Sequence, residues 1–113
     1  YISGPMRGYP DFNFPLFRET AEKLRKAGWI VIDPSYNFGG NAHAPVEFYM
    51  RTDFSNVLST ARAVGVLPGW KKSVGAVTET VIGANINIPI INADTEEPVT
   101  DVLDWFKAKL QQD

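Results

Sequence analysis

The chain has 113 residues, 44% of them hydrophobic and 21% charged, so it fits one globular domain over residues 1–113 with a packed core and does not fit the disordered class. Its formal net charge of −2 excludes a general attraction to nucleic-acid polymers or anionic membranes, and no apolar run reaches the roughly 20 residues of a membrane span. There are no cysteines, which excludes disulfides and thiolate metal sites and leads us to expect a cytoplasmic protein.

The first element is the end of a strand at residues 1–3, and because Tyr1 stands in what reads as mid-strand, we expect residues before it. A turn-rich stretch follows, and residues 11–29 then hold the clearest helix. Asn13 is its predicted N-cap and Gly28 its predicted end. The apolar side chains that recur on one face of this helix are Phe17, Ala21 and Leu24.

The middle of the chain contains two further strands and a helix. Residues 29–32 are a short apolar run and are predicted as the second strand. A Gly/Asn-rich loop over residues 35–44 contains His43, for which a surface position is favoured over a metal site because no cysteine or second histidine accompanies it. An amphipathic helix is predicted over residues 45–61 and the third strand over residues 63–67.

The last part of the chain repeats the alternation of helix and strand. A third helix is predicted over residues 73–84, a fourth strand over residues 89–92 and a final helix over residues 99–111. The adjacent Trp105 and Phe106 cannot share one face of the final helix, so we expect one of them to be exposed or to contact another subunit.

The order of these elements, β-α-β-α-β-α-β-α, predicts an α/β fold. Uninterrupted apolar strands that alternate with amphipathic helices are typical of a parallel sheet covered by helices on both faces. Right-handed crossovers then favour a doubly wound, flavodoxin- or Rossmann-like sheet of about four strands in the order 2-1-3-4. In such a sheet a ligand binds beyond the carboxyl ends of the strands.

Two of the loops at that edge carry groups that suit an anion. Gly4 and Gly8 bracket Arg7 after the first strand, and glycines allow backbone N–H groups to approach a ligand. Ser73 and Gly75 open the third helix, where free N–H groups and the helix dipole favour an anion. These residues are consistent either with a phosphate site or with purely structural turns. The sequence has neither a GxGxxG motif nor a Walker lysine motif, which disfavours dinucleotides and triphosphates.

Two carboxylates lie close to the apolar faces of predicted helices. Glu79 lies about one turn inside the third helix, where it could point into the ligand crevice or into solvent. Asp53 lies in the second helix beside the apolar positions Met50 and Phe54, and a half-buried aspartate needs a partner. That partner could be another group of the same helix, such as Arg51, or a ligand in the crevice.

Four stretches in one order resemble a known family. They are "YISGPMRG", the Phe-Pro helix after it, "YMRTDFSNVL" and "VGVLPGWKKSVGAVTE". Over roughly residues 1–92 the chain resembles a family of small uncharacterised bacterial and phage proteins, which in turn resembles the nucleoside 2-deoxyribosyltransferase superfamily. The closest characterised likeness is to the 2′-deoxynucleoside 5′-monophosphate N-hydrolases.

The resemblance implies roles for individual residues. Glu79 stands at the position of the nucleophilic glutamate and Tyr1 at that of the tyrosine that orients it. Asp53 stands at the position of the aspartate that assists the leaving base. The residues that match the loops holding the 5′-phosphate are Gly4, Arg7, Gly8, Ser73 and Gly75.

Two positions bear on the substrate that the resemblance implies. The deoxyribosyltransferases, which take unphosphorylated nucleosides, tend to carry a carboxylate where Ser73 stands, so the serine implies a nucleotide substrate. Pro5 stands where the monophosphate hydrolases have a small hydroxyl residue. The proline removes a hydroxyl and an N–H donor, which implies a weaker grip on the phosphate or a different ligand.

The function implied by the resemblance is that of an N-glycosidase that cleaves or transfers the deoxyribose–base bond of a 2′-deoxynucleoside 5′-monophosphate. No metal and no cofactor are expected, and the expected partners are a small-molecule nucleotide and further copies of the chain in a homodimer or larger homo-oligomer. The alternatives are a non-catalytic nucleotide-binding or sensing module, and a glycosidase acting on a ribosyl dinucleotide or a cyclic signalling nucleotide.

Overall fold

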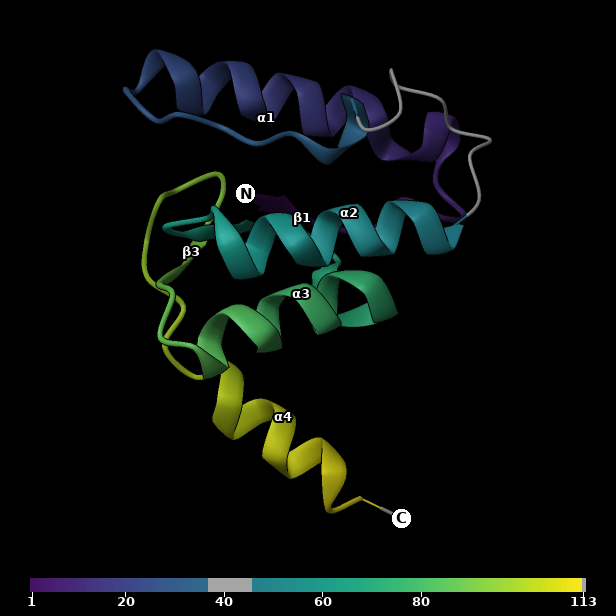
Figure 1. Ribbon diagram of the computed structural model, residues 1–113, viewed down its shortest axis with the longest axis vertical. Coiled ribbons are helices and arrows are strands. Elements are labelled where there is room, and N and C mark those ends of the chain that lie inside the picture. The colour runs from purple at the N-terminus through teal and green to yellow at the C-terminus, as the bar shows by residue number, and fades with distance from the viewer. Residues whose placement is uncertain (37–45, 113) are drawn as a thin grey trace.

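The protein is an α/β structure in which helices lie on both faces of a small parallel sheet (Figure 1). The computed structural model describes residues 1–36 and 46–112. Most of the predicted Gly/Asn-rich loop, His43 included, therefore lies outside the described residues. The helices are α1 (Phe14–Lys26), α2 (Val46–Ser59), α3 (Val74–Asn85) and α4 (Val102–Leu110).

The sheet consists of β1 (Ile2–Ser3), β2 (Val64–Val66) and β3 (Ile90–Asn92) in the order β1-β2-β3, and both pairs are parallel. Ile2 lies opposite Gly65 in this register. Because all the strands run the same way, their carboxyl ends lie at one edge of the sheet. The loops that follow β1 and β2 meet at that edge.

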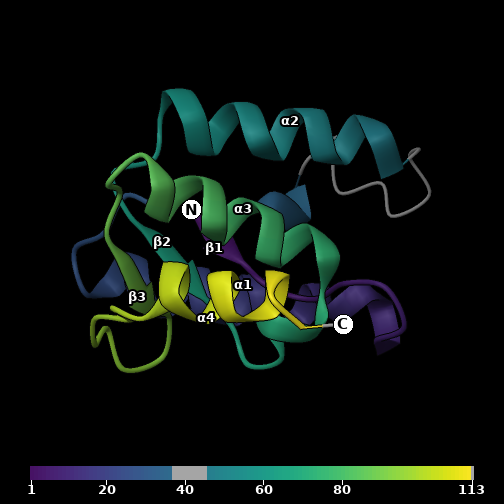
Figure 2. The same ribbon diagram turned by 90° about the horizontal axis from the view of Figure 1, so that it is seen from below.

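The two faces of the sheet bury separate groups of apolar side chains. Successive residues of a strand point to opposite faces, so Ile2 packs against α1 while Tyr1 packs on the other face. Figure 1 shows α1 on one side of the strands and α2 and α3 on the other, and Figure 2 shows α4 beside α3. The core beneath α1 includes the predicted face of that helix and consists of Ile2, Phe17, Ala21, Leu24, Leu67 and Ala93. The core on the opposite face consists of Tyr1, Val57, Val64, Val66, Trp70, Ala76, Ile90 and Val102.

The ends of α1 follow the predicted signals in part. Asn13 occupies the N-cap position and Pro15 the first turn, but the Asn13 side chain makes no capping bond. Its Nδ2 instead donates to the carbonyl of Pro5 at 2.9 Å, which ties the start of the helix to the loop after β1. At the other end Gly28 adopts a φ of 104°, a left-handed conformation that suits glycine after a helix.

The predicted second strand is the main point at which the fold differs from expectation. Residues 29–32 belong to no strand, and the described residues contain no four-stranded sheet. One backbone bond joins the segment to β1, from the N–H of Ile2 to the carbonyl of Ile32 at 3.2 Å. A strand needs a repeated ladder of bonds, and β1 spans only two residues, so it offers little for a neighbour to pair with. Ile30 is accordingly 97% exposed.

The final helix is shorter than predicted and its apolar face is incomplete. Val102 is buried, whereas Leu110 at the other end of the helix is 69% exposed. Trp105 and Phe106 are both half-buried, and the Trp105 ring meets Trp70 edge-on at 5.3 Å between centroids. Within the described residues, no helix has the length and apolar character to cross a membrane.

Candidate active site

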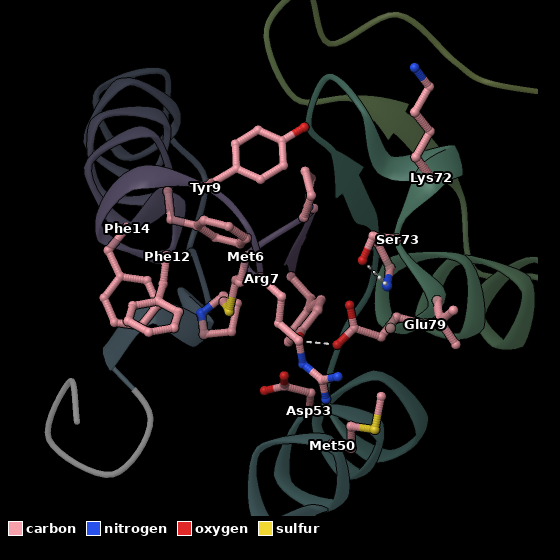
Figure 3. A pocket seen from close by; sticks show the side chains of 18 residues that line it. Met6, Arg7, Tyr9, Phe12, Phe14, Met50, Asp53, Lys72, Ser73 and Glu79 are labelled. Carbon is pink, nitrogen blue, oxygen red and sulfur yellow. Dashed lines mark hydrogen bonds between the residues drawn. The ribbon is translucent and has the colours of Figure 1, made fainter. Parts of the chain in front are cut away.

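A cavity of about 480 Å³ opens at the carboxyl ends of β1 and β2, between the loop after β1, α2 and the start of α3 (Figure 3). Volumes of this order hold small-molecule ligands in proteins. Gly8 is the only predicted site residue that is absent from its lining. Those that line it are Tyr1, Gly4, Arg7, Asp53, Ser73, Gly75 and Glu79.

The Glu79 carboxylate lies on the inner wall of the cavity and is held by both of its oxygens. The side chain is only 6% exposed. The Tyr1 hydroxyl donates to Oε2 at 2.5 Å, and the Ser3 hydroxyl donates to Oε1 at 2.8 Å. Both donors come from one face of the first strand, because side chains two residues apart in a strand point the same way. The carboxylate is therefore fixed in orientation by β1.

A second carboxylate changes the electrostatics of the first. Asp53 on α2 is buried and lines the same cavity. Burial, and next the charge of Asp53, raise the pKa of Glu79 from 4.5 to about 8, against the opposing effect of the Tyr1 and Ser3 hydrogen bonds. Two such carboxyls lose their protons in separate steps. One proton is therefore retained between Glu79 and Asp53 through the neutral range.

The Tyr1 hydroxyl shares this environment. Burial raises its pKa well above 10, and the negative charges of Glu79 and Asp53 raise it further. Tyr1 therefore remains a protonated hydrogen-bond donor through the neutral range, and its hydrogen bond favours the ionised form of the Glu79 carboxylate.

The start of α3 forms another wall of the cavity. Ser73 is its N-cap, and its Oγ accepts a hydrogen bond from the Ala76 N–H at 3.2 Å. Since the hydroxyl proton is not used in that bond, it can be donated to a ligand. A methyl group added at Gly75 would lie 3.7 Å from Cε of Met50, so the glycine is not demanded by packing and instead widens the cavity. The wall combines a helix N-terminus with little steric bulk, which suits an anion.

The two glycines that bracket Arg7 serve the fold in different ways. A methyl group added at Gly4 would lie 2.7 Å from Cβ of Leu67, so this glycine lets the loop after β1 pass close to the end of β2. Gly8 adopts a φ of 81° with nothing within 4 Å of an added methyl group, so its role is that of a turn residue. Backbone geometry is therefore sufficient to explain Gly8.

Arg7 brings a positive charge to the cavity. Its side chain is exposed and lines the cavity, and Figure 3 shows its guanidinium directed into the opening that Asp53 and Glu79 also face. Lys72 also lines the mouth, although its side chain points away from the interior (Figure 3). Lys72 is exposed to solvent.

An apolar wall faces the start of α3 and was not predicted. The rings of Phe12 and Phe14 lie 6.0 Å apart between centroids. Asp11, Phe12 and Asn13 have φ values of 52°, 55° and 62°, a left-handed run that ordinary side chains seldom adopt. No sequence rule anticipates three such residues, so the position of Phe12 could not be foreseen. The apolar residues of this wall are Met6, Tyr9, Phe12, Phe14 and Phe17.

The groups that line the cavity differ in chemical kind. Among residues 1–36 and 46–112 no group of three histidine, cysteine, aspartate or glutamate side chains converges as metal ligands would. The cavity instead joins a carboxyl pair, a hydroxyl-capped helix start, an arginine and an aromatic wall. These groups can hold a molecule that has an anionic end, a polar middle and a flat apolar end.

A family model described as a domain of unknown function, DUF4406, matches residues 1–92. The matched range includes every residue that lines the cavity and ends before α4. No curated protein matches the chain, and no solved structure does.

Proposed function

The chain belongs to the DUF4406 family, a domain of unknown function, and from its cavity we propose that it is an N-glycosidase that cleaves the bond between the base and the sugar of a 2′-deoxynucleoside 5′-monophosphate. The observation that carries the proposal is the carboxyl pair of Glu79 and Asp53. Both are buried in one cavity, and burial together with the charge of Asp53 raises the pKa of Glu79 to about 8. A nucleophile and an acid are the two groups that glycoside cleavage requires.

The reaction proceeds in two balanced steps. In the first, the proton that the carboxyl pair retains lies on Asp53, and a lone pair of the Glu79 carboxylate, ionised in that arrangement, forms a bond to C1′ of the sugar. The C1′–N bond breaks, and its electron pair leaves with the base, which takes up a proton from Asp53 directly or through a water molecule. In the second step water attacks C1′, gives its proton to Asp53 and releases both the Glu79 carboxylate and deoxyribose 5-phosphate. A second base in place of water would give base transfer.

The remaining groups of the cavity fit the other parts of a nucleotide. The phosphate lies at the start of α3, where Ser73 and the backbone around Gly75 donate to it, and Arg7 balances its charge. The base lies against the aromatic wall that contains Phe12 and Phe14, since flat rings stack on aromatic side chains. The chemistry needs no metal and no redox cofactor.

We extend the proposal to the fold and the assembly. The single bond between Ile2 and Ile32 supports an arrangement in which residues 29–32 take the place of a fourth strand beside β1, in the doubly wound order 2-1-3-4. The exposed apolar Ile30 and Leu110 support a homodimer or larger homo-oligomer. We place the protein in the cytoplasm because the chain has no cysteines.

The test is to incubate the purified protein with deoxynucleoside and ribonucleoside monophosphates, nucleosides and NAD, and to measure free base by chromatography. Release from deoxynucleoside monophosphates is expected. Glu79→Gln should lower turnover by on the order of a hundredfold or more without loss of nucleotide binding. Glu19→Gln, which removes an exposed carboxylate of α1, is the matched control. An unchanged rate in Glu79→Gln would remove Glu79 from the chemistry, and tight binding without release from any compound would identify a nucleotide-binding module instead.

A further inference from the structure

Ser3 was not singled out by its sequence, yet it makes the second hydrogen bond to the Glu79 carboxylate. Its side chain is completely buried on β1. Its hydroxyl lies 2.8 Å from Oε1 of Glu79 and 3.3 Å from the carbonyl oxygen of Ala76. Ala76 precedes Glu79 by nearly one turn of α3, so the helix presents two acceptors to a single hydroxyl.

A serine hydroxyl has one proton and can donate to one of these acceptors at a time. The shorter distance and the negative charge favour Oε1 of Glu79 while that carboxylate is ionised. The carbonyl of Ala76 remains within reach as an alternative. A buried hydroxyl with two acceptors is therefore never left unpaired when one of them changes its charge.

The groups around Glu79 act on its ionisation in opposite directions. Burial, and next Asp53 from α2, oppose its ionisation, whereas Tyr1 before β1 and Ser3 on β1 favour it through their hydroxyls. The cations that line the same cavity are Arg7, directed into its opening, and Lys72, directed away from it (Figure 3). The two hydroxyls thus favour the ionised form of Glu79, which the neighbouring Asp53 disfavours. Loss of either hydroxyl leaves one oxygen of Glu79 without its donor.

We propose that Ser3 is a positioning residue for the glycosidic reaction, whose hydroxyl favours the ionised form of Glu79, aims Oε1 at C1′, and then turns to the Ala76 carbonyl when Oε1 bonds to the sugar. The inference rests on the proposed nucleophilic role of Glu79. The Ser3 proton stays on Ser3 throughout, while the electron pair of Oε1 forms the new bond and the pair of the C1′–N bond leaves with the base. Tyr1 keeps its bond to Oε2 in both states.

The direct test is an NMR titration of the Glu79 carboxyl that needs no substrate. Protein labelled with ¹³C at the glutamate carboxyls is titrated, and the Glu79 signal is identified by its absence in Glu79→Gln. In Ser3→Ala the midpoint of that signal should rise by about one pH unit, since a hydrogen bond to a charged group is lost. Thr80→Val is the matched control, because its buried hydroxyl has no hydrogen-bond partner and the midpoint should not move.

Turnover gives the second readout. Ser3→Ala should lower kcat by about tenfold or more with little change in KM, because the interaction lost acts on the reacting carboxylate and not on nucleotide binding. Ser3→Cys, which keeps the volume of the side chain but is a weak donor, should shift the titration in the same direction if Ser3→Ala does not fold.

An unchanged Glu79 midpoint in Ser3→Ala and Ser3→Cys would overturn the inference, and so would a shifted midpoint with unchanged kcat. These results differ from a failure of the proposed function. If Glu79→Gln kept full turnover, the glycosidase proposal would fail even though the Glu79 titration still responded to Ser3.

Discussion

The hydroxyl of Tyr1, the residue before β1, donates a 2.5 Å hydrogen bond to Oε2 of Glu79 on α3, across 78 positions of the sequence. Ser3 adds a bond to the other oxygen from β1 itself. The first strand therefore determines how the third helix presents its carboxylate to the cavity. Because Asp53 of α2 lies close enough to raise the pKa of Glu79, the packing of β1, α2 and α3 together determines the chemistry of the site.

The stability of the protein should depend on pH through Glu79. Burial and the Asp53 charge raise its pKa from 4.5 to about 8, so between these values the folded chain keeps a proton that the unfolded chain has released. The free energy of unfolding therefore falls as pH rises through this window, and the loss is complete above it. Glu79→Gln removes this dependence. Its stability relative to wild type should be higher at pH 9 than at pH 5 by roughly a few kcal/mol, as measured by urea unfolding.

Glu19→Gln serves as the control for that measurement, since Glu19 is an exposed side chain that does not line the cavity. Its stability difference from wild type should be the same at both pH values. A Glu79→Gln difference that does not change between pH 5 and pH 9 would mean that Glu79 ionises in the folded protein as it does in the unfolded chain.

The proposed acid can be separated from the nucleophile by the choice of base. Asp53→Asn should lower kcat for deoxyguanosine monophosphate by about a hundredfold or more, because the departing base then lacks its proton donor. A base methylated at N7 already carries a positive charge and leaves without that proton. With this substrate the loss should shrink to less than about tenfold, as measured by base release in single-turnover experiments.

Asp104→Asn, which alters an exposed carboxylate in the first turn of α4, should leave both rates unchanged. An equal loss on the two substrates in Asp53→Asn would assign Asp53 to sugar binding or folding instead of proton delivery.

Arg7 should matter for the phosphate alone. Arg7→Ala should raise KM for a deoxynucleoside monophosphate by about ten- to a hundredfold, the range expected for a lost charge-assisted hydrogen bond, and should change KM for the matching nucleoside little. Steady-state kinetics on the two compounds measures the difference. Arg62→Ala, another exposed arginine outside the cavity, is the control. Equal effects of Arg7→Ala on both compounds would refute a phosphate contact.

Two cavity glycines should respond to alanine in opposite ways. In Gly4→Ala the new methyl group would meet Leu67 at 2.7 Å, so the variant should lose about 1–3 kcal/mol of stability through overpacking. In Gly75→Ala the methyl group would make an ordinary 3.7 Å contact with Met50, so the melting temperature should hold while nucleotide affinity falls. Calorimetry measures both quantities. If Gly75→Ala bound nucleotide with unchanged affinity, the phosphate would not lie at the start of α3.

The periodic elements could be predicted, whereas the pairing of strands could not. The apolar face of α1 and the start of α3 at Ser73 follow from residue spacing and capping chemistry, which act within a few residues. Residues 29–32 carry an apolar run as good as that of β2, yet they form no strand. An apolar run becomes a strand only if a neighbouring strand is long enough to form a ladder of hydrogen bonds with it. The neighbour of residues 29–32 is β1, which has only two residues.

In the candidate site, too, some residues could be predicted from the sequence and others could not. Tyr1, Asp53 and Glu79 were expected together, and they line one cavity. Ser3 was missed, although the strand period of two that places Tyr1 beside Glu79 also places Ser3 there. Phe12 was missed because its position depends on three successive left-handed residues, which no local preference favours.

By itself the sequence determined the local features of this protein: the faces of its helices, the serine cap of α3, the glycine turns and the residue types available for chemistry. These follow from interactions within a turn or two of chain. Only the tertiary structure decided that Glu79 is buried with hydroxyls on both oxygens and Asp53 nearby, and hence that its pKa lies near 8. Burial and charge act through space, and the elements that bring β1, α2 and α3 together are far apart in the chain.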